Sequence, residues 1–249
     1  MLKKFGLLAG MVILWQALCT AGIAGSHLPS PAAVLRGLYE LSGSGLPRGQ
    51  LLHMHAFASI LRVLAGFSAA MTLAVPAGLL AGWSAPVRSQ VLPIADIIKP
   101  IPPLAWIPLS IFWFGLGLKA AAFIIFLGAF FPIFLNTVSG VLSVEKQLVE
   151  AARTLGAGEG RIFTGVLLPG ALPSIFTGAR IGLGVAWMTL IAAEFAGVRS
   201  GTGLGYMIMC ARDIGRPDLI VAGMAAIGLA GYILDFLIRR VEERALSWR

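Results

Sequence analysis

Apolar runs of about 20 residues or more recur along the chain, and short polar segments separate them. A membrane-spanning α-helix needs about 20 predominantly apolar residues. The pattern predicts spans at residues 5–25, 57–83, 91–116, 120–144, 174–197 and 219–238. We therefore expect an all-α, polytopic membrane protein with six transmembrane helices in one transmembrane domain, residues 1–249. Short amphipathic helices are expected outside the membrane after the first and fifth spans.

The first apolar run, Phe5 to Gly25, follows Lys3 and Lys4 and could be a secretory signal or a retained span. Its length exceeds the 7–15 apolar residues of a signal core, so we favour a retained span. The next polar stretch places Ser30 as the N-cap and Pro31 as the first residue of a short helix.

Composition strengthens the membrane interpretation, because 58% of the residues are hydrophobic, 12% are charged and the mean hydropathy is +0.89. The net charge of +8 comes from basic residues scattered among the span ends, which indicates cytoplasmic loops and anionic headgroups rather than nucleic acid. With the N-terminus inside, ten Lys and Arg residues fall on the inner side and six on the outer side. This bias predicts that both termini are cytoplasmic.

The sequence offers little for catalysis or metal binding. Cys19 and Cys210 form no framework, and we expect two unreactive thiols, although a disulfide is conceivable. His53 and His55 have no third ligand nearby. The chain contains no G-x-x-x-x-G-K-[ST] phosphate loop and no Ser, His and Asp set. We therefore expect no catalytic residue, no metal and no cofactor in this chain.

One polar, glycine-rich segment, residues 145–173, interrupts the apolar pattern and is called the 145–173 loop below. Val144 to Leu155 reads as a helix with an apolar stripe, and a second helical turn with Ile162 and Phe163 follows Gly160. The stripe comprises Leu148, Ala151, Ala152 and Leu155, and Pro169 and Pro173 mark the entry to the fifth span. Exposed apolar side chains on a cytoplasmic loop indicate a docking element for a soluble partner.

The spacing of residues in this loop resembles a known motif. Glu150-Ala151-Ala152, then Gly156, then Val166-x-Leu168-Pro169 resembles the "EAA" loop of binding-protein-dependent ABC importer permeases, which usually have Ile where Val166 stands. "KPIPPLAWIPLSIFWFGLG", "GAFFPIFLNT" and "TGARIGLGVAW" are similar to permeases for nitrate, taurine and aliphatic sulfonates. The resemblance implies the type I ABC importer permease fold. It also implies that the loop couples to a separate ATPase through Glu150, Ala151, Ala152, Arg153, Leu155, Gly156, Val166, Leu168 and Pro169.

The same resemblance implies a function and a set of partners. The chain would carry a small anionic solute across a bacterial inner membrane, as a homodimer within the lipid bilayer. A cytoplasmic ATP-binding subunit would hold ATP and Mg, and a periplasmic substrate-binding protein would deliver the solute. A thiamine-precursor-like solute is an alternative substrate. A stand-alone secondary transporter is an alternative class, although it would need mid-span acidic groups and usually inverted repeats.

The third span carries Pro100, Pro102, Pro103 and Pro108, and such prolines break helices where the backbone is buried in protein or lines a cavity. We expect this break to line the pathway or a gate. The candidate pathway and gate residues are Pro102, Pro103, Trp106, Trp113, Asn136, Arg180, Trp187 and Glu194.

Other polar residues in the spans have simpler expected roles. Asp96 and Lys99 should pair near the cytoplasmic rim. Arg62 should snorkel toward the headgroups, and Arg180 should snorkel or bind groups beside Glu150. Glu194 should serve an outer gate or a structural hydrogen bond. Asn136 should link helices by hydrogen bonding, and Gly78-x-x-x-Gly82 and Gly178-x-x-x-Gly182 should allow close helix approach.

Overall fold

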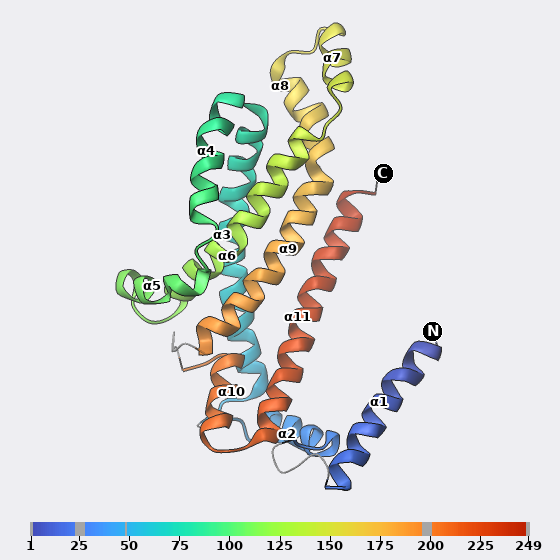
Figure 1. The fold of residues 1–249 in the computed structure, drawn as a ribbon, viewed down its shortest axis with the longest axis vertical. Helices are drawn as coiled ribbons and strands as arrows, with labels where there is room; N and C mark the ends of the chain where they lie inside the picture. The colour runs from blue at the N-terminus through green and yellow to red at the C-terminus, as the bar shows by residue number, and fades with distance from the viewer. Residues whose placement is uncertain (1, 23–27, 48, 196–200, 248–249) are drawn as a thin grey trace. The chain divides into compact units, whose positions relative to one another are not determined.

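A computed structural model describes residues 2–22, 28–47, 49–195 and 201–247, and the regular elements in these ranges are all helices (Figure 1). The chain separates into two compact units. Unit 1 comprises residues 1–60 and 199–230, and unit 2 comprises residues 61–198 and 231–249. The helices are α1 (Leu2–Thr20), α2 (Pro31–Gly43), α3 (Leu52–Trp83), α4 (Ala85–Ile98), η1 (Pro103–Trp106), α5 (Ile107–Phe114), α6 (Leu118–Leu142), α7 (Lys146–Thr154), α8 (Glu159–Ile162), η2 (Phe163–Leu167), α9 (Leu168–Phe195), α10 (Leu204–Asp213) and α11 (Pro217–Ala245).

Within the described residues, four helices are long and apolar enough to cross a membrane: Leu52–Trp83, Leu118–Leu142, Glu159–Phe195 and Pro217–Ala245. The broken pair Ala85–Ile98 and Pro103–Phe114 would add a fifth span, and Ala9–Thr20 is a shorter apolar helix. The all-α, multi-pass architecture is therefore confirmed, while the count of six spans stays a prediction.

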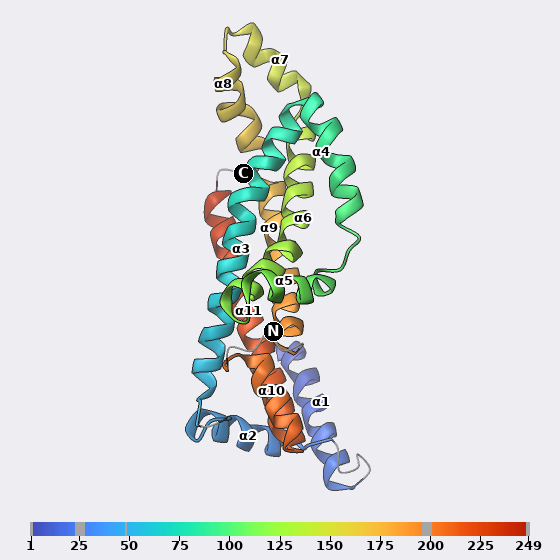
Figure 2. The ribbon, with the colours of Figure 1, turned by 90° about the vertical axis from the view of Figure 1, so that its left-hand side faces the viewer.

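In unit 2, α6 packs closely against both α3 and α9 through the predicted glycine pairs (Figure 2). A Cβ atom built on Gly82 of α3 would lie 2.5 Å from Val141 Cβ, and one on Gly182 of α9 would lie 2.8 Å from Ile133 Cγ1. Both distances are shorter than real Cβ contacts allow, so only glycine lets the backbones approach this far. The expected role of these glycines in helix packing is confirmed.

The proline-rich stretch breaks the third predicted span as expected. The α4 helix ends at Ile98, and the helical segment that starts at Pro103 is turned by 81° from it. Figures 1 and 2 both show α5 lying crosswise, while α4 runs beside the long helices. The prolines remove backbone donors and exclude helical geometry for the residues before them, which accounts for the break.

The C-terminal end of the 145–173 loop differs from the prediction. Pro169 and Pro173 do not mark the start of a separate span, because Glu159–Phe195 forms one helix of 37 residues. Phe163–Leu167 within it is a π-helical turn, in which the Leu168 amide donates to the Phe163 carbonyl. The Pro169 ring would clash with the carbonyl four residues back, so the ladder widens locally rather than ending.

Unit 1 holds the short helices that the sequence predicts. The Ser30 side chain accepts a hydrogen bond from the Ala33 amide at 3.3 Å, which confirms it as the N-cap of α2. Ser59 Oγ of α3 accepts the Leu204 amide at 2.9 Å, and His55 Nδ1 accepts the Gly203 amide at 3.0 Å. Side chains of α3 therefore satisfy backbone donors where α10 begins.

A charged cluster joins α2 to the segment before α11 in unit 1. Arg216 Nη2 lies 2.7 Å from Glu40 Oε2 and 2.8 Å from Asp218 Oδ2. The pKa of Arg216 is raised above its usual value because Asp218 and Glu40 accept its hydrogen bonds. Cys19 and Cys210 are both half-buried and are not joined to each other in the structure.

Candidate functional site

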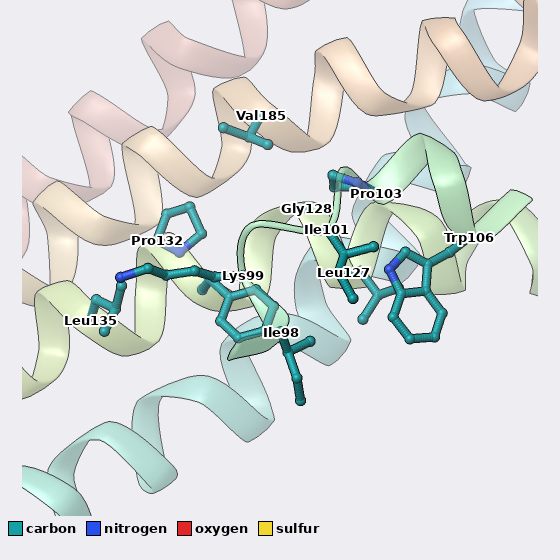
Figure 3. Close-up of a pocket in the computed structure, with 11 residues that line it drawn as sticks. Ile98, Lys99, Ile101, Pro103, Trp106, Leu127, Gly128, Pro132, Leu135 and Val185 are labelled. Carbon is teal, nitrogen blue, oxygen red and sulfur yellow. The ribbon is translucent and has the colours of Figure 1, made fainter. Parts of the chain in front are cut away.

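The break between α4 and η1 opens onto a cavity of about 310 Å³ in unit 2 (Figure 3). Its walls come from the end of α4, from η1, from the middle of α6 and from α9. The lining residues are Ile98, Lys99, Ile101, Pro103, Trp106, Leu127, Gly128, Phe131, Pro132, Leu135 and Val185. Two residues expected in the pathway, Pro103 and Trp106, thus lie together on one cavity, whereas Pro102 caps η1 and is exposed.

Lys99 lines this cavity, although the sequence indicated only that it pairs with Asp96 near the cytoplasmic rim. The pair forms, with Lys99 Nζ 2.6 Å from Asp96 Oδ1. The cavity that Lys99 lines meets α6 between Leu127 and Leu135, around the middle of Leu118–Leu142. A charge beside a proline-rich break was the signal in the sequence for this residue.

Three other pathway candidates contact aromatic or backbone groups of unit 2. Trp113 packs edge-on against Phe123 at 5.8 Å between ring centroids. The Asn136 amide donates to the Pro132 carbonyl of its own helix at 2.8 Å, so the expected hydrogen bond to another helix is not the one it makes. Trp187 of α9 packs on α11, where a Cβ on Gly231 would lie 2.8 Å from its Nε1.

Glu194 and Arg62 form a buried ion pair between α9 and α3. Arg62 Nη1 donates to Glu194 Oε1 at 2.7 Å, and the two side chains are 6% and 3% exposed. Arg62 therefore does not snorkel to the headgroups, because a carboxylate inside the fold balances its charge. The expectation of a structural hydrogen bond at Glu194 agrees with this geometry.

Arg180 of α9 also has a partner that the sequence did not indicate. Its Nη1 lies 3.4 Å from Glu242 Oε2, and its Nε lies 4.0 Å from Asp235 Oδ1. Both carboxylates belong to α11, so the ion-pair partners of Arg180 lie on that helix and not beside Glu150. It instead ties α9 to the C-terminal half of α11.

The first helix of the 145–173 loop, α7, ends at Thr154, and Gly156 closes a hydrogen-bonded cap directly after it. Gly156 has φ +78°, its amide donates to the Arg153 carbonyl at 2.9 Å, and the Ala157 amide donates to the Ala152 carbonyl at 3.0 Å. These two bonds form a Schellman motif, which needs a residue that tolerates positive φ. Arg153 also pairs with Glu159 across the turn at 3.0 Å.

In the 145–173 loop, the residues that are buried differ from those of the predicted apolar stripe. Val149 and Ala152 pack against a buried cluster that includes Ile162 and Leu167. Ile162 is fully buried and Phe163 packs edge-on against Trp83, so neither is displayed as expected. Leu148 and Leu155 are 53% and 88% exposed. The residues carried over from the motif lie on the exposed face at Glu150, Ala151, Arg153, Leu155 and Gly156, and are partly buried at Ala152, Val166, Leu168 and Pro169.

The described residues hold no group of three or more His, Cys, Asp or Glu side chains that could bind a metal ion. The features that remain are a cavity at a broken helix, an ion pair at its edge, and a compact helical loop with one exposed apolar tip. The loop projects past the ends of α4 and α6 in Figure 1.

Comparisons with known proteins show what the chain that carries these features is similar to. The family model described as "Binding-protein-dependent transport system inner membrane component" matches residues 74–246. The taurine transport system permease protein of Escherichia coli is 36% identical, covering 98% of this chain and 89% of that protein. The nitrate import permease protein of Synechocystis is 34% identical, covering 95% and 86%. An inward-facing structure of the MetNI methionine ABC transporter shares the fold, with a TM-score of 0.60, 24% identity, and coverage of 86% of this chain and 97% of that chain.

Proposed function

The chain belongs to the binding-protein-dependent transport system inner membrane components, and on that premise we propose that it imports a small anionic solute. As a multi-pass permease of the inner membrane, it supplies the route across the bilayer. The names of two relatives support the anionic class, since nitrate is an anion and taurine carries a sulfonate group. One observation on this chain also supports it: the cavity at the broken helix carries a lysine.

The 145–173 loop is the proposed contact with a cytoplasmic ATP-binding subunit, which binds ATP and Mg. Leu155, 88% exposed at the loop tip, offers an apolar anchor, and exposed Glu150 on α7 offers an acceptor for a basic group. The loop continues without interruption into Glu159–Phe195. A displacement of the loop by the ATPase therefore moves α9, and with it the wall of the cavity at Val185.

The remaining proposed partners follow from the family. Both termini and the loop lie in the cytoplasm, a second copy of the chain completes the pathway, and a periplasmic substrate-binding protein delivers the solute. The candidate gate residues are Pro102, Pro103, Trp106, Trp113, Asn136, Arg180, Trp187 and Glu194. Of these, Pro103 and Trp106 line the cavity.

Uptake in proteoliposomes tests this function. The chain, its ATP-binding subunit and its binding protein are reconstituted, and uptake of labelled taurine, nitrate, ethanesulfonate and a thiamine precursor is measured with and without ATP on the ATPase side. We expect ATP-dependent uptake of nitrate or of at least one solute with a sulfonate group. Uptake that needs no ATPase subunit and follows an ion gradient would identify a secondary transporter instead. ATP-driven uptake of only a thiamine-precursor-like solute would overturn the anionic class.

A further inference from the structure

The cavity at the α4 break lies near the centre of the bilayer. The α6 helix has 25 residues, and at 1.5 Å per residue it is about 37 Å long, which matches a membrane crossing. The cavity wall on α6, Leu127 to Leu135, straddles the middle of that helix. Lys99 and Asp96 are therefore charged groups at mid-membrane depth.

The solvent exposure of the Lys99 and Asp96 side chains indicates what this side of α4 faces in the membrane. The Lys99 and Asp96 side chains are 43% and 59% exposed on this chain. Charged groups facing lipid at the bilayer centre are costly, so such residues face the bundle interior or a water-filled cavity. This side of α4 therefore borders either water or another protein surface, and lipid does not cover it.

The cavity itself presents only one member of the ion pair. Lys99 is among the lining residues and Asp96 is not, while the rest of the lining is apolar. Figure 3 shows the extended Lys99 side chain passing Pro132 toward Leu135, with Trp106 at the other end of the labelled group. The cavity thus has a cationic end and an aromatic, apolar end.

We propose that this cavity is a binding site for a small organic anion. The acidic head of the ligand pairs with the Lys99 ammonium, and its short apolar part packs against Trp106 and the α6 wall. This inference rests on the proposed function and specifies the site and the substrate chemistry: an alkanesulfonate or a similar short-chain anion. A volume of about 310 Å³ is at the small end of ligand cavities and suits a ligand of a few heavy atoms.

Asp96 is the counter-ion of Lys99. Its carboxylate neutralises the Lys99 ammonium at 2.6 Å, which lowers the cost of holding that charge at this depth. An anionic ligand takes the place of Asp96 as the partner of Lys99. Asp96 therefore competes with the ligand for Lys99 and does not itself contact the ligand.

Equilibrium dialysis of the full chain in phosphatidylcholine nanodiscs tests the site directly. The probes are labelled n-alkanesulfonates from methane- to hexanesulfonate, with neutral alkyl methyl sulfones of matching length. We expect affinity for the sulfonates to rise about fourfold per methylene until the cavity is full, since each buried methylene contributes about 0.8 kcal/mol. Lys99→Met should weaken sulfonate binding about tenfold to a hundredfold and leave sulfone binding unchanged.

Two further variants separate a ligand site from a merely structural ion pair. Asp96→Asn should strengthen sulfonate binding, because the competing carboxylate is gone, whereas loss of a structural pair would weaken binding in both variants. Trp106→Ala should flatten the dependence on chain length. Lys119→Met removes an exposed lysine of α6 that does not line the cavity, and it should bind like the wild type.

Failure of the proposed site and failure of the proposed function give different results. Equal sulfonate affinity in wild type and Lys99→Met would overturn the site. Affinity that has not levelled off at hexanesulfonate, with competition by phosphatidylglycerol, would show a lipid occupant instead. Failure of the proposed function looks different: the wild-type complex would take up no anion with ATP. If that complex takes up an alkanesulfonate and Lys99→Met does so with the same KM, the function stands and the site falls.

Discussion

At the scale of single residues, the Arg62–Glu194 pair shows how distant charges share one site. The two residues are separated by 132 positions, and each looks like an isolated charge near the end of an apolar run. Sequence periodicity cannot show that α3 and α9 bring them within 2.7 Å. The pair is nearly excluded from solvent, so each charge helps to compensate the other.

Removing one partner should therefore cost more than removing both. Glu194→Gln leaves the Arg62 guanidinium buried beside a neutral amide and should lower the unfolding free energy by about 3 kcal/mol. The double variant Arg62→Met/Glu194→Met should lose less than Glu194→Gln alone. Unfolding in mixed micelles with increasing SDS compares the wild type, Glu194→Gln and the double variant. A larger loss in the double variant than in Glu194→Gln would show that the two charges do not compensate each other.

At the scale of elements, the close packing of α9 on α6 depends on individual glycines. Gly182 faces Ile133 and the Ala129 carbonyl, while nothing lies within 4 Å of a Cβ on Gly184, two residues further along the same helix. Gly182→Ala should force the helices apart and destabilise the protein by about 1–3 kcal/mol. Gly184→Ala should be neutral or stabilising by about 0.5–1 kcal/mol, because alanine favours the helix. Thermal unfolding in detergent compares them, and equal effects would contradict the close approach.

The helix cap at the end of α7 can be tested by comparing Gly156 with Gly158, a control glycine in the same loop. Gly156 has φ +78°, whereas Gly158 has φ −73°, and a Cβ on either would meet open space. Gly156→Val should break the Schellman motif and weaken assembly with the ATP-binding subunit, while membrane insertion stays normal. Gly158→Val should assemble like the wild type. Co-purification of the ATPase with each variant is the measurement, and equal yields would show that the cap geometry is not needed for docking.

Local signals predicted some elements well. Pro100, Pro102 and Pro103 indicated the broken span, Ser30 indicated a helix start, and Gly156 indicated a helix end, because each acts on its own backbone. The exposure of Leu148 and Leu155 agrees with the prediction, whereas the display of Ile162 and Phe163 was predicted wrongly. Periodicity cannot show that tertiary packing buries Ile162 and places Phe163 and Val149 against the same cluster. The continuous helix through Pro169 was also missed, since a π-helical turn absorbs that proline.

At the scale of the whole molecule, the orientation in the membrane follows only from the distribution of Lys and Arg. Once Cys19 and Cys210 are replaced, single cysteines can be introduced in place of Gly158 in the loop and of Ile214, which is 55% exposed. Their labelling shows on which side of the membrane each position lies. An impermeant maleimide should label Ile214→Cys in intact cells and Gly158→Cys only after permeabilisation. The reverse pattern would place the loop outside and exclude an ATPase contact.

Coupling between the loop and ATP hydrolysis is the central claim for the whole molecule, and Glu150 gives access to it. A charge-assisted contact with the ATPase is worth about 1.5–3 kcal/mol, or about tenfold to a hundredfold in docking. Glu150→Lys removes that attraction and adds repulsion. The substitution does not change the cavity or the other end of α6. Asp213→Lys is the control, since Asp213 is an exposed acid of α10 paired with its neighbour Arg212.

The most direct test is ATP hydrolysis by the reconstituted complex, measured with and without loaded binding protein. The wild type and Asp213→Lys should respond to the loaded binding protein. Glu150→Lys should remain folded and inserted, and its ATPase should dissociate or hydrolyse ATP without that response. A charge reversal of the facing basic residue on the ATPase should restore part of it. Full stimulation and full uptake in Glu150→Lys would contradict the assignment of the 145–173 loop as the coupling element.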